Sequence, residues 1–285
     1  MRDHLDRVIQ LGADELNRWI GDGRKLCDLK TVYGDGCDYS LSHVQALYLL
    51  RFYPAYFVEN YMLFNVIKND ISACDHDLEP FVSSLACGSM VDAAAARFVF
   101  EDDCLYDGYD VNRWLGVDEN CIEDEYDFYQ TSIFDIESLH ISANIVVFSR
   151  SLMDIGLRVS RLNNMVASTE FESDVVYVCG TFPPGIRNDF AHNRLCEFAG
   201  FFGDFDREVL YRHSVDGDDC LRYGDISGEY EWFNCIQPVN HRALLDRCTQ
   251  DSSATCPSQG CDNIKYLPIR NFSNLEFEVF KLTRR

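Results

Sequence analysis

Short apolar runs, separated by polar loops and helix-like stretches, dominate the chain from residue 80 onward. They lie at residues 81–87, 104–111, 131–136, 143–149 and 174–182. Runs without polar alternation are typical of strands buried on both faces, and such strands occur in parallel sheets that helices cover. The pattern therefore predicts an α/β fold with a doubly wound, mostly parallel sheet.

Helical spacing of apolar residues precedes and separates these runs. Over residues 40–70 it predicts two consecutive helices, or one helix kinked at Pro54. Further helices are expected over residues 90–100, 152–169 and 190–201. Residues 207–213 and 275–285 alternate between polar and apolar positions and predict a final β-hairpin at one edge of the sheet.

Composition divides the chain into three parts. Residues 1–75 are interpreted as an N-terminal helical segment that closes over the functional site, and residues 76–216 as a Rossmann-like core. Residues 217–274 are richer in polar residues, proline and cysteine than the rest. Residues 217–285 are therefore interpreted as a cysteine-rich insertion followed by the final edge strand of the same domain.

The chain is acidic, and its charge restricts the choice of partner. It has 285 residues with 25 Lys+Arg against 47 Asp+Glu, which gives a formal net charge of -22. Such a charge repels a phosphate backbone, so duplex nucleic acid is disfavoured as a partner. We expect the acidic stretch at residues 116–129 to be a solvated surface loop.

The cysteine content and the N-terminal residues indicate the cellular compartment of the protein. The first residues are charged and lack an apolar signal core, and the apolar stretches are too short to span a bilayer. We therefore expect no membrane association. Thirteen cysteines in such a chain favour reduced thiols or ligands over disulfides, which predicts a cytoplasmic protein.

The stretch SLACGSMVDAAAARF, residues 84–98, predicts a strand, a corner of small residues and then a helix. Gly88 at the corner allows a ligand to approach the backbone, and the new helix presents its unbonded N–H groups to the same space. A nucleotide-like ligand would fit there. The alternative is that the glycine only turns the chain, as in many α/β proteins.

Two carboxylates are expected near this corner, because the carboxyl ends of parallel strands share one edge of the sheet. Asp110 ends the second predicted strand, about twenty residues after the glycine, where it can accept hydrogen bonds from both ribose hydroxyls. Asp135 ends the third predicted strand, where it can accept a hydrogen bond from an adenine amine while Phe134 or Ile136 covers the base. The order of corner, ribose acid and base acid predicts a nucleoside site.

This order and spacing resemble the class I S-adenosylmethionine-dependent methyltransferases, over roughly residues 41–181. The resemblance implies S-adenosylmethionine as cofactor and methyl transfer as the reaction. It places Ala86, Gly88 and Met90 where the family has three glycines, and Ser84 where it usually has an acid, so this chain is a divergent relative. The residues that it implies for cofactor binding are Ser84, Ala86, Cys87, Gly88, Asp110, Val111, Phe134, Asp135 and Ser149.

The methyl acceptor is less defined by the sequence. DNA and amide methyltransferases often carry Asn or Asp, two prolines and an aromatic residue after the fourth strand, whereas this chain has FSRS at residues 148–151. A small molecule or a protein side chain is therefore favoured as acceptor. Glu59 and Tyr56 are candidate catalytic residues. The alternative is that the aromatic residues of this helix are packed in the core. Candidate substrate-binding residues are Tyr53, Arg150, Arg187 and His192, of which Arg150 would hold an anionic acceptor or lie at the surface.

Two further interpretations stay open beside a methyltransferase. A nicotinamide-dependent oxidoreductase would need glycines at Ala86, Gly88 and Val91, of which only Gly88 is present. A binding or sensor protein that keeps the fold without turnover would account for Ala86 and Met90. Zinc is possible but not favoured, because the soft ligands Cys235, His241, Cys248, Cys256 and Cys261 lack a paired C-x-x-C spacing.

Overall fold

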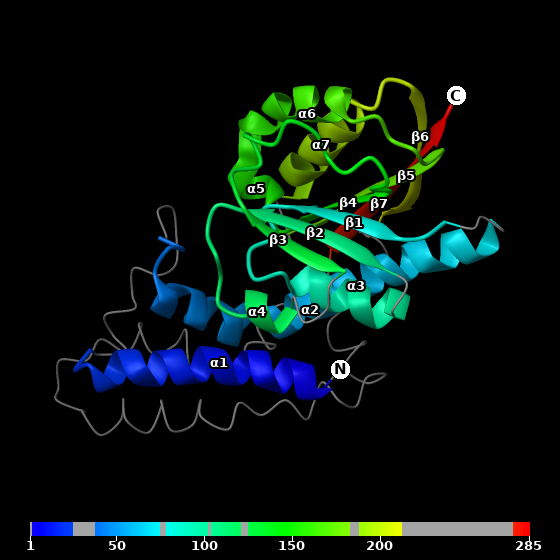
Figure 1. Cartoon of the computed structure of the whole chain (residues 1–285). Helices are drawn as coiled ribbons and strands as arrows, with labels where there is room; N and C mark the ends of the chain where they lie inside the picture. The colour runs from blue at the N-terminus through cyan, green and yellow to red at the C-terminus, as the bar shows by residue number, and fades with distance from the viewer. Residues whose placement is uncertain are drawn as a thin grey trace.

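A seven-stranded sheet with helices on both faces forms the centre of the protein (Figure 1). The computed structural model describes residues 2–24, 38–74, 78–101, 104–120, 125–182, 188–212 and 276–285. Its strands are β1 (Phe81–Leu85), β2 (Leu105–Asp110), β3 (Tyr126–Gln130), β4 (Ile145–Ser149), β5 (Val175–Phe182), β6 (Phe205–Arg212) and β7 (Glu276–Arg284). The strand order is β3-β2-β1-β4-β5-β7-β6. This confirms the predicted α/β fold.

Among the described strands, only β7 runs against the direction of the others. Strands β1 to β5 pair in parallel, whereas β7 is antiparallel to both of its neighbours, β5 and β6. The chain order reverses where β1 meets β4, and ligands in open α/β sheets bind at such a switch point, beyond the carboxyl ends of the strands. The predicted antiparallel pair at one edge of the sheet is confirmed by β6 and β7.

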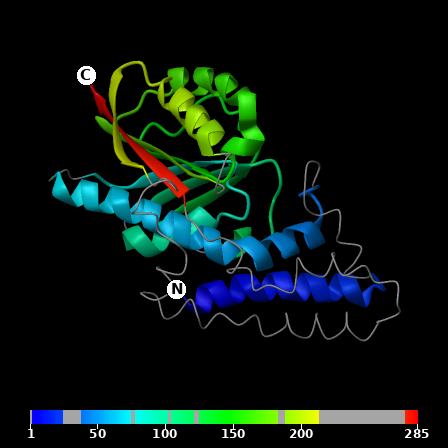
Figure 2. The ribbon, with the colours of Figure 1, turned by 180° about the vertical axis from the view of Figure 1, so that it is seen from behind.

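Helices cover the two faces separately, as Figures 1 and 2 show from opposite sides. One face carries α2 (Ser42–Ala73), α3 (Val91–Phe100) and the short α4 (Val117–Asn120), with α1 (Arg2–Gly21) packed outside α2. The other face carries α5 (Leu152–Ile155), the 3₁₀ helix η3 (Gly156–Leu162), α6 (Asn163–Ser168) and α7 (Asn188–Ala199). None of the described helices is long and apolar enough to cross a membrane.

The two faces of the sheet bury separate hydrophobic clusters, and β5 shows how one strand supplies both. Val175, Tyr177 and Cys179 belong to the cluster beneath α1, α2 and α3, whereas Val176 and Val178 belong to the cluster beneath α5 and α7. Successive side chains of a strand point to opposite faces. A central strand therefore needs apolar residues at every position, which is why its sequence run lacks alternation.

Two parts of the sequence interpretation were wrong. The third strand is Tyr126–Gln130 and not residues 131–136, and residues 116–129 contain α4 and most of β3 as well as loop. The reason is that β3 lies at the edge of the sheet, where only Tyr126 is buried, so its apolar signal is weak. The segment expected as two helices or one kinked helix is a single helix, α2, with Pro54 inside it.

The domain division of the sequence stays a prediction. Residues 213–275, which include most of the expected insertion and all of the expected zinc ligands, lie outside the described residues. Because β7 is antiparallel to both β5 and β6, β6 ends and β7 begins at the edge where β1 to β5 have their carboxyl ends. The connection between Arg212 and Glu276 therefore leaves and rejoins the sheet on the side of the switch point.

The corner between β1 and α3 has a left-handed backbone at alternate residues. The φ angles of Ala86, Gly88 and Met90 are +59°, +55° and +56°. Only glycine adopts this conformation without steric cost, and each L-residue in it is destabilised by roughly 1–2 kcal/mol. The corner thus keeps a glycine-type path although two of its three left-handed residues carry side chains.

Replacing these two residues by glycine should shift stability in opposite directions. Ala86→Gly relieves the steric cost and should raise the free energy of unfolding by about 1 kcal/mol. Met90→Gly also relieves it, but removes a fully buried side chain, and loss of such a side chain costs about 2–5 kcal/mol. Urea unfolding of both variants measures the two effects. A less stable Ala86→Gly protein would show that this corner is not strained in solution.

Candidate functional site

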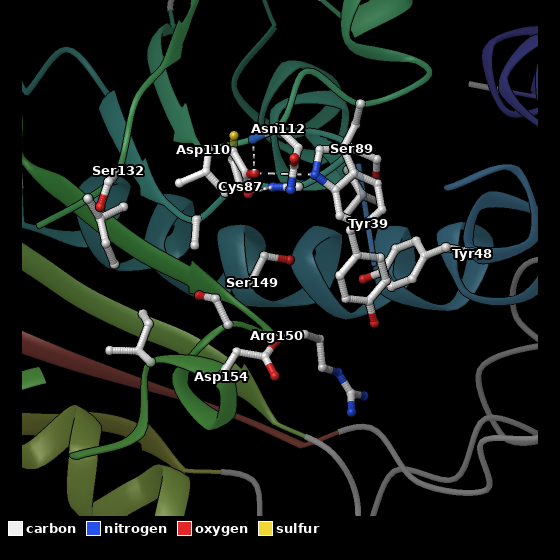
Figure 3. A pocket seen from close by; sticks show the side chains of 18 of the residues that line it. Tyr39, Tyr48, Cys87, Ser89, Asp110, Asn112, Ser132, Ser149, Arg150 and Asp154 are labelled. Atoms are coloured by element: carbon white, nitrogen blue, oxygen red, sulfur yellow. Dashed lines mark hydrogen bonds between the residues drawn. The ribbon is translucent and has the colours of Figure 1, made fainter. Parts of the chain in front are cut away.

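A cavity of about 310 Å³ lies at the switch point, at the lower end of the range for small-molecule sites. Its walls are residues 86–89 after β1, residues 110–112 after β2, residues 132–134 after β3 and residues 149–151 after β4. Tyr39 and Tyr48 from the N-terminal segment (Figure 3) and Trp114 complete one side of the cavity. Strand ends that are far apart in sequence therefore share one cavity.

Asp110 holds the floor of this cavity together. Its Oδ2 accepts a hydrogen bond from the Gly88 amide at 3.0 Å, and its Oδ1 accepts from the Asn112 amide at 2.8 Å and from Trp114 Nε1 at 3.3 Å. Burial raises the pKa of this carboxyl, and the bonds from Asn112, Gly88 and Trp114 oppose the rise. The Val111 amide adds a smaller effect in the same direction.

Aromatic residues form the side of the cavity next to Asp110. Trp114 stacks on Tyr39 with ring centroids 5.0 Å apart and planes 29° apart, and Tyr48 approaches Trp114 edge-on at 5.0 Å. We call Tyr39, Tyr48 and Trp114 the aromatic wall. Burial raises the pKa of Tyr48 well above its ordinary value, so its hydroxyl stays neutral near physiological pH. The wall therefore offers ring faces and neutral donors.

A buried ion pair joins α2 to the loop after β4. Arg150 Nε donates to Glu59 Oε2 at 2.8 Å, Arg150 Nη2 contacts Glu59 Oε1, and the guanidinium lies 4.7 Å from the centre of the Tyr56 ring. The Arg150 side chain is 6% exposed and that of Glu59 is fully buried. Burial raises the pKa of Glu59 to about 7, although the charge of Arg150 opposes the rise.

Further polar contacts fix the loop that follows β4. Asn60 on α2 donates to Ser149 Oγ at 2.9 Å, and the Arg150 amide donates to Thr181 Oγ1 at 3.1 Å. Ser151 Oγ donates to the Leu85 carbonyl at 2.9 Å, which links the ends of β4 and β1. Arg150 has a φ of +61°, so the loop holds a non-glycine residue in a left-handed conformation at the cavity wall. Strained residues of this kind are concentrated at functional sites.

The structure brings some of the sequence-predicted site residues together and separates others. Those that line the cavity are Ala86, Cys87, Gly88, Asp110, Val111, Phe134, Ser149 and Arg150. Those that do not line it are Tyr53, Tyr56, Glu59, Ser84, Asp135 and His192. Arg187 lies outside the described residues. That one adenosyl group touches both Asp110 and Asp135 stays a prediction, and of these two residues only Asp110 lines the cavity.

The residues outside the cavity have other surroundings. Asp135 is exposed in the turn after β3, beyond the cavity-lining residues 132–134. Ser84 is buried within β1, and the Tyr53 hydroxyl donates to Asn120 Oδ1 at 3.0 Å inside the core. Glu59 and Tyr56 surround the Arg150 guanidinium. These positions are typical of packing and positioning residues.

His192 belongs to a separate polar cluster on α7 and β7. Its Nδ1 is 2.5 Å from Glu278 Oε2, and its Nε2 is 3.4 Å from Cys196 Sγ. Burial raises the pKa of the Cys196 thiol. Within the described parts of the chain, no group of three or more His, Cys, Asp or Glu residues has the arrangement of a metal site.

Several of the residues that line the cavity were not predicted from the sequence, among them Tyr39, Tyr48, Trp114, Asp154 and Arg158. Trp114 could have been predicted, because it lies shortly after Asp110 on the loop that follows the second predicted strand. Tyr48 lies on the same helix as the predicted Tyr56, but nearer its start. Helical spacing identifies the aromatic helix, but not which of its turns faces the cavity.

Comparison with known proteins gives only weak likenesses. No family model matches the chain, and no curated protein matches it. A methyltransferase of Geobacter sulfurreducens, solved with S-adenosylhomocysteine and named S-adenosylmethionine-dependent, is similar with a TM-score of 0.41 and 13% identity over 80% of this chain and 91% of that one. Escherichia coli YjhP has a TM-score of 0.40 and 11% identity over 80% and 92% of the two chains. Bacillus subtilis YcgJ has a TM-score of 0.40 and 11% identity over 77% and 98%.

Several of the similar solved structures are methyltransferases by name, all at low identity. Because each TM-score is below 0.5, these likenesses do not decide what this chain binds. The function must be argued from the cavity itself.

The Glu59–Arg150 pair makes stability depend on pH. The pKa of Glu59 is about 7 in the folded protein against an ordinary value of 4.5, so the folded state holds this proton more tightly than the unfolded state. The contribution of this bound proton to the free energy of unfolding, ~3 kcal/mol, is therefore fully present below pH 4.5 and is lost as the pH rises through 7. Urea unfolding from pH 4.5 to 8 measures this change. The difference in unfolding free energy between Glu59→Gln and wild type should shift by this amount in favour of the variant as the pH rises. A difference that stays constant with pH would mean that Arg150 keeps Glu59 ionised throughout.

Proposed function

We propose that this chain is an S-adenosylmethionine-dependent methyltransferase acting on a small molecule or a protein side chain. The observation that carries the proposal is the hydrogen bond from the Gly88 amide to Asp110, because it brings a left-handed corner and a strand-end carboxylate into one cavity at the switch point. Corner and carboxylate are the two elements that a nucleoside cofactor needs in such a sheet.

The cavity residues fit an adenosyl group in several respects. Asp110 lines the cavity at the end of β2, where its carboxylate can accept a hydrogen bond from a ribose hydroxyl. Ile133 and Phe134 offer apolar surface for the base. Ala86 and Met90 keep the left-handed backbone in spite of their side chains, so replacement of two glycines has not changed the path of the corner.

Methyl transfer asks little of the protein beyond alignment. When bound, the cofactor supplies an electrophilic methyl group: a lone pair of the acceptor forms a bond to its carbon, while the S–C bond breaks and leaves its electron pair on sulfur. Holding two reactants in line supplies most of the acceleration for such a step. Glu59 and Tyr56 are assigned no catalytic role in this proposal, because their polar and ring groups act on Arg150 and not on the cavity.

A nicotinamide cofactor fits the corner less well. The third glycine of that motif would fall at Val91, whose side chain is buried at the start of α3. A binding protein without turnover would use the same cavity and the same Asp110. Binding experiments therefore distinguish a nicotinamide enzyme from the proposed methyltransferase. Activity on a set of acceptors distinguishes a binding protein from it.

Titration calorimetry with S-adenosylhomocysteine tests the cofactor directly. The wild-type protein should bind it, and Asp110→Ala should lose about a hundredfold in affinity, because a charge-assisted hydrogen bond and the anchoring of the corner are both removed. Asp135→Ala is the matched control and should keep wild-type affinity, since this exposed side chain does not line the cavity.

Two results would contradict this assignment. Binding of NAD in place of S-adenosylhomocysteine would show that the cofactor is wrong. A loss of affinity in Asp135→Ala as large as that in Asp110→Ala would show that the base lies along the turn after β3 and outside the cavity.

A further inference from the structure

The two arginines that line the cavity already have internal partners. Arg150 makes its ion pair with Glu59, so its charge is balanced within the protein. Arg158 directs Nε to the Ile155 carbonyl at 3.4 Å and Nη2 to the Asp154 carbonyl at 2.9 Å, and lies over the Phe134 ring at 5.0 Å. Nε and Nη2 form the edge that an arginine uses to bind a carboxylate or phosphate with two hydrogen bonds. The expectation that Arg150 holds an anionic acceptor is therefore not favoured by its surroundings.

Asp154, in contrast, is a carboxylate that lines the cavity without a hydrogen-bonded partner for its side chain among the described residues. The residue is exposed. Figure 3 shows Asp154 on the opposite side of the cavity from Asp110 and Cys87, with Ser149 between them. Burial raises the pKa of Asp154, and the charge of Arg158 lowers it. The cavity thus has one carboxylate held at the corner and a second carboxylate at its other side.

The aromatic wall lies within electrostatic reach of Asp154. The negative charge of Asp154 adds to the raised pKa of both Tyr48 and Tyr56, although burial, the neighbouring tyrosines and the opposing charge of Arg150 have larger effects. A ring next to the aromatic wall already contacts one cation, because the Arg150 guanidinium lies over Tyr56. The Tyr56 ring packs edge-on against Tyr48, with centroids 5.8 Å apart. Aromatic faces beside a carboxylate attract ammonium groups and organic cations.

We infer that the acceptor of the proposed methyl transfer is an amine that is positively charged in solution and carried on an apolar or aromatic group, held between Asp154 and the aromatic wall. This inference rests on the proposed function, because the adenosyl group must occupy the Asp110 side for the Asp154 side to be left to the acceptor. Asp154 attracts the charged nitrogen and accepts one of its protons, which frees the lone pair that forms the bond to the methyl carbon. Tyr39 and Tyr48 pack against the apolar part of the acceptor. An anionic acceptor would be repelled by Asp154, and the Nε–Nη2 edge of Arg158, which could offset this repulsion, is bonded to backbone carbonyls.

Calorimetry on protein saturated with S-adenosylhomocysteine separates these possibilities. The probes are tyramine, tyrosol and 3-(4-hydroxyphenyl)propionate at millimolar concentration, which share one ring and differ in charge. Tyramine should bind at least about tenfold more tightly than the propionate, since one charge-assisted contact is gained and one repulsion avoided. Asp154→Asn should weaken tyramine about tenfold, to the level of tyrosol, and leave the affinity for S-adenosylhomocysteine unchanged.

Asp204→Asn is the matched control, because Asp204 is an exposed aspartate outside the cavity, and it should leave all four affinities unchanged. Equal binding of tyramine and the propionate would overturn the inference and leave the proposed function standing. Weaker binding of S-adenosylhomocysteine to Asp154→Asn would also overturn it, because Asp154 would then hold the amino group of the cofactor. Failure of the wild type to bind S-adenosylhomocysteine would overturn the proposed function, and the inference with it.

Discussion

The carboxylate of Asp110 is the contact on which the arrangement of the site depends. Its bonds to Gly88, Asn112 and Trp114 join the corner after β1, the loop after β2 and the aromatic wall. A buried carboxylate is costly without such donors, so the loops are held where they can supply them. The left-handed φ of Gly88 is part of the same arrangement, because it sets the path on which this amide meets Asp110. The shape of the cavity and the placement of the aromatic residues thus follow from one side chain, and the proposed ribose contact would depend on the same one.

The N-terminal segment is part of the site and not an appendage to it. Helix α2 reaches the loop after β4 through the Glu59–Arg150 pair and through the bond from Asn60 to Ser149, and it also supplies Tyr48. Removing one partner of a buried ion pair leaves an uncompensated charge in the core, which fixes how this helix can pack. The cavity therefore has one side formed by the backbone corner and the Asp110 carboxylate, and another formed by aromatic rings and Asp154.

Much of this fold could be predicted from the pattern of apolar residues, because central parallel strands need apolar side chains on both faces. The same argument failed for β3, which is exposed at the sheet edge, and the misplaced strand end carried Asp135 into the expected site. Gly88 and Asp110 could be found because corner and strand end have local sequence signals. The partner of Glu59 could not, since the pair joins residues far apart in the chain, and periodicity says nothing about which buried charges meet.

A crystal structure of the protein with S-adenosylhomocysteine tests the central claim most directly. The account predicts the adenosyl group in the cavity, with one ribose hydroxyl about 3 Å from the Asp110 carboxylate, the base against Ile133 and Phe134, and Asp154 not in contact with the ligand. Electron density for the ligand at another place, or a ribose without contact to Asp110, would contradict it.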